Sequence, residues 1–189
     1  MRSCHARVCA RTVIAIATAA AALVLAGPAA ATTVVFADGT HRPQPYQGWI
    51  DRTHVPTPNG TLTLVLGPCA QSYSWAAACA DPAARTVYLD SDRRRDTFLH
   101  EVGHLFDARA MRRGTRAAFQ RLIGRRGPWD APPATDPPSE QFAEAYSLCA
   151  RKRTLRSAHF GMYDYIVSPR VHLRVCALIR RAQRATAGS

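Results

Sequence analysis

The chain has 189 residues and a formal net charge of +12, and nearly all of its basic residues are arginines. Residues 32–189 are numerous enough for one domain with a single hydrophobic core. The arginines stand in short clusters near the ends of predicted elements and do not alternate with aromatic residues. Nucleic-acid binding favours one continuous basic stripe. The arrangement therefore indicates solvated helix ends and argues against a nucleic-acid partner.

The first 31 residues have the pattern of a cleavable secretory signal. Residues 1–11 contain three arginines and no acidic residue, and residues 13–26 are apolar except for Thr18. Three alanines at 29–31 predict cleavage after Ala31. The apolar run is shorter than the roughly 20 residues of a membrane span, so a retained anchor is the less favoured alternative. We expect a signal peptide at 1–31, one domain at 32–189, secretion, and no stable membrane insertion after signal removal.

The first half of the domain is predicted to be mainly β-structure. Runs of β-branched and aliphatic residues predict strands at 32–37, 61–66 and 85–90, and 46–51 is a weaker strand candidate. The two prolines and the Asn-Gly step in residues 55–60 predict a turn. Residues 68–84 are expected to form a long loop.

The second half is predicted to be helical. One helix runs from a cap at Ser91 or Asp92 to about Met111. A second runs from a cap at Thr115 to about Ile123 and ends at Gly124. After a proline-rich extended segment, Ser139 is placed to cap a third helix. Pro169 opens the last helix as its first residue. Strands followed by helices indicate an α+β domain, with a small sheet backed by helices.

Four cysteines follow the predicted signal, an even number in a secreted chain, and this suggests two disulfides. We favour the pairs Cys69–Cys79 and Cys149–Cys176 over the other two pairings because each joins neighbouring elements. A zinc site made of four cysteines is disfavoured because no pair has the CxxC spacing.

Residues 100–104 read HEVGH and carry the pattern of a zinc-peptidase helix. His100 and His104 are four residues apart, so on a helix both rings project from one face. Glu101 lies beside them and can accept a proton from a water at the same metal. The helix face away from the metal is apolar, which predicts that it is buried, and Gly103 predicts a close backbone approach.

The third ligand is predicted to be Glu140. The whole chain has three glutamates, one in HEVGH and two in SEQFAEAY (139–146). Glu140 and Glu144 are four residues apart, so they share a helix face; Glu140 would meet the metal and Glu144 would bond a ligand histidine. Asp136 is the alternative ligand. Asp107 is expected to accept a histidine N–H or a helix-packing hydrogen bond. Ala110 occupies the position where a metzincin needs its third ligand, which excludes that class.

HEVGHLFD followed by EQFAEAY resembles the gluzincin metallopeptidases of the anthrax-lethal-factor type, over about residues 92–150. The chain also resembles small secreted actinobacterial proteins of unassigned activity. The resemblance implies a zincin-like domain in which His100, His104 and Glu140 hold Zn²⁺ and Glu101 is the general base.

The chain departs from that family in one respect. The family places a tyrosine that stabilises the oxyanion shortly before the ligand glutamate, and this chain has no tyrosine between His104 and Glu140. Tyr163, Tyr165 or His159 could supply that donor from another direction. The strand at 85–90 leads into the predicted metal helix, and we consider it for pairing with a peptide substrate. An ordinary core strand is the equally favoured alternative.

The function expected from these residues is a secreted, monomeric zinc metallopeptidase that acts on a peptide or protein. A first alternative is a catalytically silent zinc domain that binds a cell-envelope component or a protein. A second is a binder of nucleic acid or another anionic polymer, which predicts binding that is sensitive to salt and indifferent to chelators.

Overall fold

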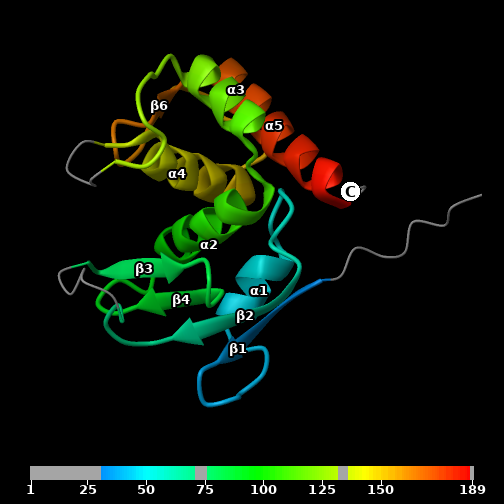
Figure 1. The fold of residues 1–189 in the computed structure, drawn as a ribbon, viewed down its shortest axis with the longest axis vertical. Coiled ribbons are helices and arrows are strands. Elements are labelled where there is room, and N and C mark those ends of the chain that lie inside the picture. The colour runs from blue at the N-terminus through cyan, green and yellow to red at the C-terminus, as the bar shows by residue number, and fades with distance from the viewer. Residues whose placement is uncertain (1–30, 71–75, 132–135, 188–189) are drawn as a thin grey trace, which may run out of the picture.

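The computed structural model describes residues 31–70, 76–131 and 136–187. The predicted signal peptide and its cleavage site lie almost wholly outside these residues. Within them the chain forms five helices, a four-stranded mixed sheet and a two-stranded hairpin. The fold is therefore mixed α and β, with the main sheet in the first half and most helices in the second (Figure 1). No helix in the described part of the chain is long and apolar enough to cross a membrane.

The four-stranded sheet has the order β1-β2-β4-β3. Its strands are β1 (Thr32–Phe36), β2 (Gly60–Val65), β3 (Ala78–Asp81) and β4 (Thr86–Leu89). β1, β2 and β4 are parallel, and β3 pairs with β4 in the antiparallel direction. The three strands predicted with most support are confirmed, whereas the predicted loop at 68–84 contains the unpredicted strand β3.

Residues 46–51 form helix α1 (Tyr46–Asp51), so their prediction as a strand was wrong. Tyr46 and Ile50 lie four residues apart and are both buried, which a helix achieves by placing them on one face. The side chain of Gln47 accepts a hydrogen bond from the Val34 backbone N–H and donates one to the Thr32 carbonyl. The helix thereby satisfies backbone groups of β1, a role that the local pattern did not reveal.

The other helices are α2 (Arg95–Ala110), α3 (Arg113–Ile123), α4 (Pro138–Arg151) and α5 (Pro169–Ala187). The predicted end at Gly124 is confirmed by its left-handed conformation, with φ of 72°. Pro169 is the first residue of α5, as predicted, and the Ser168 hydroxyl accepts a hydrogen bond from the Val171 N–H.

The predicted N-terminal caps of α2, α3 and α4 were wrong. These helices begin after Arg94, Arg112 and Pro137, none of which makes a side-chain capping bond. Asp92 still accepts a hydrogen bond from the Arg94 N–H, but it does so from outside the helix. Tertiary packing therefore decides these helix starts more strongly than local capping.

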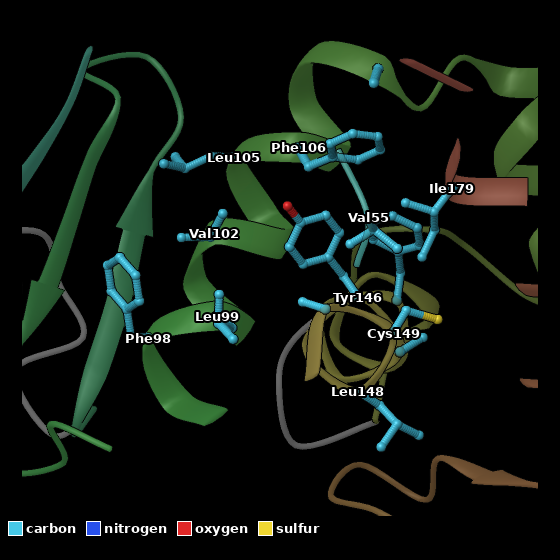
Figure 2. Close-up of a cluster of buried hydrophobic side chains, with 14 of the residues drawn as sticks. Val55, Phe98, Leu99, Val102, Leu105, Phe106, Tyr146, Leu148, Cys149 and Ile179 are labelled. Atoms are coloured by element: carbon cyan, nitrogen blue, oxygen red, sulfur yellow. The ribbon is translucent and has the colours of Figure 1, made fainter. Parts of the chain in front are cut away.

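Helix α2 lies between the sheet and α4, and apolar side chains cover it on both sides. Figure 2 shows Phe98, Val102 and Leu105 directed toward the sheet, while Phe106 lies on the side where Tyr146 of α4 packs. All five side chains are buried, as predicted for the apolar face of the metal helix. A helix that is apolar on most sides requires burial, and here it forms the centre of the core.

Both predicted disulfides are present. Cys69–Cys79 joins the segment after β2 to β3, and Cys149–Cys176 joins α4 to α5. The first attaches the edge strand to the sheet, and the second connects two helices behind the candidate site. A short hairpin of β5 (His159–Phe160) and β6 (Ile166–Val167), which the sequence did not predict, lies between α4 and α5 in the chain.

Candidate metal centre

Three side chains from two helices converge at the face of α2 that bears the histidines. The Nε2 atoms of His100 and His104 are 3.2 Å apart. The Oε2 atom of Glu140, from the first turn of α4, lies 3.1 Å from the His100 nitrogen and 3.4 Å from the His104 nitrogen. These residues are grouped closely enough to hold a metal ion.

The spacing of these three atoms matches the size of a zinc site. Ligand atoms about 2.0–2.1 Å from a tetrahedral zinc ion are separated from one another by roughly 3.3 Å. The three measured separations, 3.1, 3.2 and 3.4 Å, lie around this value. Two imidazoles and a carboxylate are also a donor set that zinc accepts in catalytic sites. Asp136, the alternative ligand, is not part of this group.

Close packing of α2 against α4 sets the distance between the histidines and Glu140. A Cβ atom at Gly103 would lie 3.0 Å from the Cα of Ala143 and 3.1 Å from the Cβ of Tyr146. Only a glycine allows the two helix backbones to approach so closely. The expected close backbone approach at Gly103 is therefore present, and the approaching backbone belongs to the helix that carries Glu140.

Electrostatic attraction between His100 and Glu140 shifts the pKa values of both groups. Burial by itself lowers the pKa of His100, but hydrogen bonds to Glu140 and Glu144 outweigh it and raise that pKa to about 10. Burial raises the pKa of Glu140, but its hydrogen bonds to His100 and His104 outweigh this and lower it. Each of these two groups therefore favours the charged form of the other.

Glu101 and His100 line the same cleft, which has a volume of about 620 Å³. This is within the range of roughly 300–1,000 Å³ typical of ligand sites. The Glu101 side chain is buried, and burial raises the pKa of its carboxyl group. A carboxylate with a raised pKa is a better proton acceptor at neutral pH than an exposed one.

Glu144 lies at the Nδ1 side of the His100 ring, whereas Glu140 lies at the Nε2 side. Its Oε2 atom is 3.8 Å from the His100 Nδ1 atom, and its Oε1 atom is 3.7 Å from the Nε2 atom of His159. A Cβ atom at Gly161 would lie 2.8 Å from the Glu144 Oε1 atom and 3.0 Å from its Cγ atom. Gly161 therefore leaves the space in which the Glu144 carboxylate stands beside the His100 ring.

Asp107 is occupied by helix packing. Its carboxylate accepts two hydrogen bonds from Arg116 of α3, each 3.0 Å long, and one of 2.8 Å from the Trp129 indole N–H. The Arg116 guanidinium also lies over the Trp129 ring. Of the two roles expected for Asp107, these contacts correspond to the packing role, and they attach α3 and the following segment to α2.

The ring of Tyr163 lies against that of the candidate ligand His100. Its ring centroid is 5.3 Å from that of His100, and it lines the same cleft. Burial, with a further contribution from Glu140, Glu101 and nearby carboxyl groups, raises the pKa of Tyr163 to about 12. The phenol therefore keeps its proton at neutral pH and remains a hydrogen-bond donor.

The backbone at Tyr163 is held in an uncommon conformation. Tyr163 and Asp164 have φ angles of 53° and 52°, in the left-handed region that favours glycine. Gln141, adjacent to Glu140, donates a hydrogen bond of 2.8 Å from its side chain to the Tyr163 carbonyl. Strained non-glycine residues persist only where their surroundings enforce them, and they are concentrated at functional sites. The turn is thus attached directly to the helix that carries Glu140.

The other two predicted donors are placed differently. His159 lines the cleft near Glu144. Tyr165 is 1% exposed, its hydroxyl has no hydrogen-bond partner among the described residues, and it is not part of the cleft lining. Burial raises the pKa of Tyr165. Of the two tyrosines, Tyr163 is the one that the fold directs toward the site.

The opposite wall of the cleft is formed by the edge of the sheet. Ala76, Ala77 and Ala78 line it, and β3 is the terminal strand of the sheet order. Of the two alternatives for residues 85–90, the ordinary core strand is confirmed and pairing with a substrate is excluded, because β4 has β2 on one side and β3 on the other. The strand that contributes a residue to the cleft is β3, through Ala78.

A second group, formed by Cys149, His172 and Cys176, also has the spacing of metal ligands. Its two cysteines form a disulfide, so neither offers the thiolate that a metal requires. His172 is fully buried, and its Nε2 atom lies 2.9 Å from the Lys152 carbonyl oxygen. In the oxidised protein this group is structural.

Some residues of the site were missed in the sequence because they have no chemical signature of their own. They are Gln141, Gly161 and the three alanines Ala76, Ala77 and Ala78. Gln141 lies next to Glu140 in SEQFAEAY, and Gly161 lies between His159 and Tyr163, so proximity in the chain was the available signal.

No family model matches the chain, and no curated protein or solved structure matches it significantly.

Proposed function

We propose that the chain is a secreted zinc-dependent metallopeptidase. The observation that carries this proposal is the convergence of His100, His104 and Glu140, beside a cleft that His100 and Glu101 line. Zinc held by these three residues would supply a Lewis acid, which polarises a carbonyl group and lowers the pKa of a water molecule. The grouping of the three side chains, the cleft and the two disulfides support the proposal.

The chain's own groups have separate roles in the proposed reaction. Glu101 accepts the proton of the attacking water and passes it to the leaving amine. Glu144 orients the His100 ring through its Nδ1 atom. Tyr163 donates its hydroxyl hydrogen to the oxygen that develops negative charge, a role supported by its ring contact with His100. The peptide lies along β3, which is the terminal strand of the sheet order among the described residues.

The metal assignment is tested by measuring zinc per chain in the wild type, Glu140→Ala and Asp136→Ala. We expect Glu140→Ala to lose most of its zinc because one of three protein ligands is removed. Asp136→Ala should retain zinc as the wild type does. Full zinc content in Glu140→Ala would show that the ligand assignment is wrong.

The peptidase activity is tested with a peptide library, comparing the wild type with Glu101→Gln and Tyr163→Phe. We expect Glu101→Gln to abolish cleavage, and Tyr163→Phe to lower kcat by about 10²-fold or more, the effect of removing one oxyanion donor. Both variants should keep full zinc. If the zinc-loaded wild type cleaves nothing, the peptidase is rejected and the catalytically silent zinc-binding domain is favoured.

A further inference from the structure

A second concave surface lies between α3 and α5, at the end of the molecule opposite the sheet (Figure 1). It has a volume of about 570 Å³, and it shares no lining residue with the metal cleft. Three arginines, Arg121, Arg174 and Arg181, surround it, and short aliphatic side chains line the rest, among them Leu122, Ala177 and Leu178. We call this surface the α3–α5 groove.

The groove has an uncompensated positive charge. The three guanidinium groups make no hydrogen bond or ion pair with any residue that the structure describes. Neither α3 nor α5 contains an acidic residue. Surface arginines are usually interspersed with acidic groups. A negatively charged ligand in the groove would therefore neutralise charge that the described part of the protein leaves unpaired.

The positions of the arginines indicate how far apart the anionic groups of a ligand would be. Arg174 and Arg181 are two turns apart on one face of α5, about 10 Å along the helix axis. Arg121 reaches the same space from α3. Between the arginines lie Ala177 and Leu178, so a ligand must present apolar groups between its charges. Guanidinium groups bind carboxylates through two parallel hydrogen bonds.

We propose that the α3–α5 groove binds an acidic peptide segment whose carboxylates pair with Arg121, Arg174 and Arg181. Its apolar side chains enter the space between them. No aromatic residue lines the groove, so a nucleic acid would lack the base-stacking contacts typical of its binding sites. Membrane binding requires protruding apolar side chains. Leu178, which lines the groove, is only 8% exposed, and this argues against a membrane as the partner.

Binding is tested by fluorescence anisotropy with a labelled short peptide of alternating glutamate and leucine, in the full chain carrying Glu101→Gln so that the peptide is not cleaved. We expect the triple variant Arg121→Gln, Arg174→Gln, Arg181→Gln to weaken binding by about tenfold or more. A control triple variant, Arg93→Gln, Arg153→Gln, Arg156→Gln, removes the same charge from exposed sites and should weaken binding less than about threefold. Equal weakening in both triple variants would overturn the proposal.

A single substitution checks the position within the groove. Ala177→Glu places a carboxylate between the arginines, and we expect it to weaken peptide binding by about tenfold while leaving the melting temperature unchanged. Wild-type binding by the folded Ala177→Glu chain would refute the proposal. So would equal binding of a peptide of alternating glutamine and leucine.

Two further probes separate the acidic peptide from other polyanions. They are a labelled thymidine oligonucleotide and vesicles of phosphatidylglycerol. We expect both to bind more weakly than the acidic peptide at physiological salt, and equally well in the two triple variants. Tighter binding of either probe, lost only in the groove triple variant, would replace the acidic peptide as the occupant.

Discussion

The imidazole of His100 stands between two carboxylates, Glu140 at its Nε2 atom and Glu144 at its Nδ1 atom. The first is the proposed metal ligand, and the second is proposed to orient the ring so that Nε2 would face a bound metal. Glu144 is itself confined by Gly161, which has no side chain to displace it. The orientation of a proposed ligand therefore depends on a residue that touches neither the metal nor the ligand.

Gly161→Ala is expected to weaken zinc binding by about tenfold, because the new methyl group displaces the Glu144 carboxylate from His100. Glu144→Gln should have a similar effect. Zinc affinity is measured by competition with a chelating dye. Gly127→Ala would be a poor control because its φ is 116°, whereas Gly114→Ala is suitable because nothing lies within 4 Å of the added Cβ atom. Unchanged affinity in Gly161→Ala would contradict the role given to Glu144.

The raised pKa of His100 predicts a pH dependence of zinc binding. With a pKa of about 10, His100 is protonated at neutral pH in the metal-free chain, and it must lose that proton to bind zinc. Glu140, whose pKa is lowered, stays ionised and releases none. Zinc affinity should therefore rise about tenfold per pH unit between about pH 7 and 9. Calorimetry in buffers of different ionisation enthalpy measures the proton release, and no release would contradict this state of His100.

At the scale of the elements, the site depends on how closely α2 and α4 pack. The metal-facing side of α2 bears His100 and His104, and its other sides are buried against the sheet and α4 (Figure 2). Gly103 lets α4 approach until Glu140 reaches the histidines. The contact between α2 and α4 at Gly103 therefore contributes to the packing of the core and also sets the geometry of the site.

Gly103→Ala is expected to destabilise the protein by about 1–3 kcal/mol, although alanine is the better helix former by about 1 kcal/mol. The added Cβ atom would lie 3.2 Å from the Ala143 carbonyl oxygen and still closer to its Cα atom, so the backbones must separate. Gly114→Ala, in open space on α3, should be neutral or slightly stabilising. Denaturant unfolding measures both, and a stabilised Gly103→Ala would show that the helices are not in close contact.

At the scale of the whole molecule, the proposed metal joins two parts of the fold. α2 packs against the sheet, while α4 is connected to α5 by Cys149–Cys176. A zinc ion bound by His100 and His104 of one helix and by Glu140 of the other would hold these parts together. Chelation should therefore affect the stability of the entire domain.

Removing zinc with a chelator is expected to lower the melting temperature by about 5–10 °C when free zinc was about 100 times its Kd, which corresponds to about 2.7 kcal/mol. The His104→Ala variant should melt at the same temperature with and without the chelator. Scanning calorimetry under non-reducing conditions measures both. A wild-type melting temperature unaffected by zinc would contradict metal binding at this site.

The sequence by itself determined the features that depend on local spacing. The four-residue interval between His100 and His104 placed both rings on one helix face. The order of the predicted elements favoured the two disulfide pairs that the structure contains, because each pair joins neighbouring elements. Because the chain has only three glutamates, Glu140 was predicted to be the third ligand. The fold brings its Oε2 atom within 3.1 Å of the His100 Nε2 atom.

Only the tertiary structure decided which strand lies at the sheet edge, that 46–51 is a helix, and which tyrosine faces His100. Each of these depends on contacts between segments far apart in the chain. Strand order depends on pairing partners, α1 forms where Gln47 meets the backbone of β1, and Tyr163 is directed by a bond from Gln141. Local periodicity carries no information about such partners, because it records only which residues share a face.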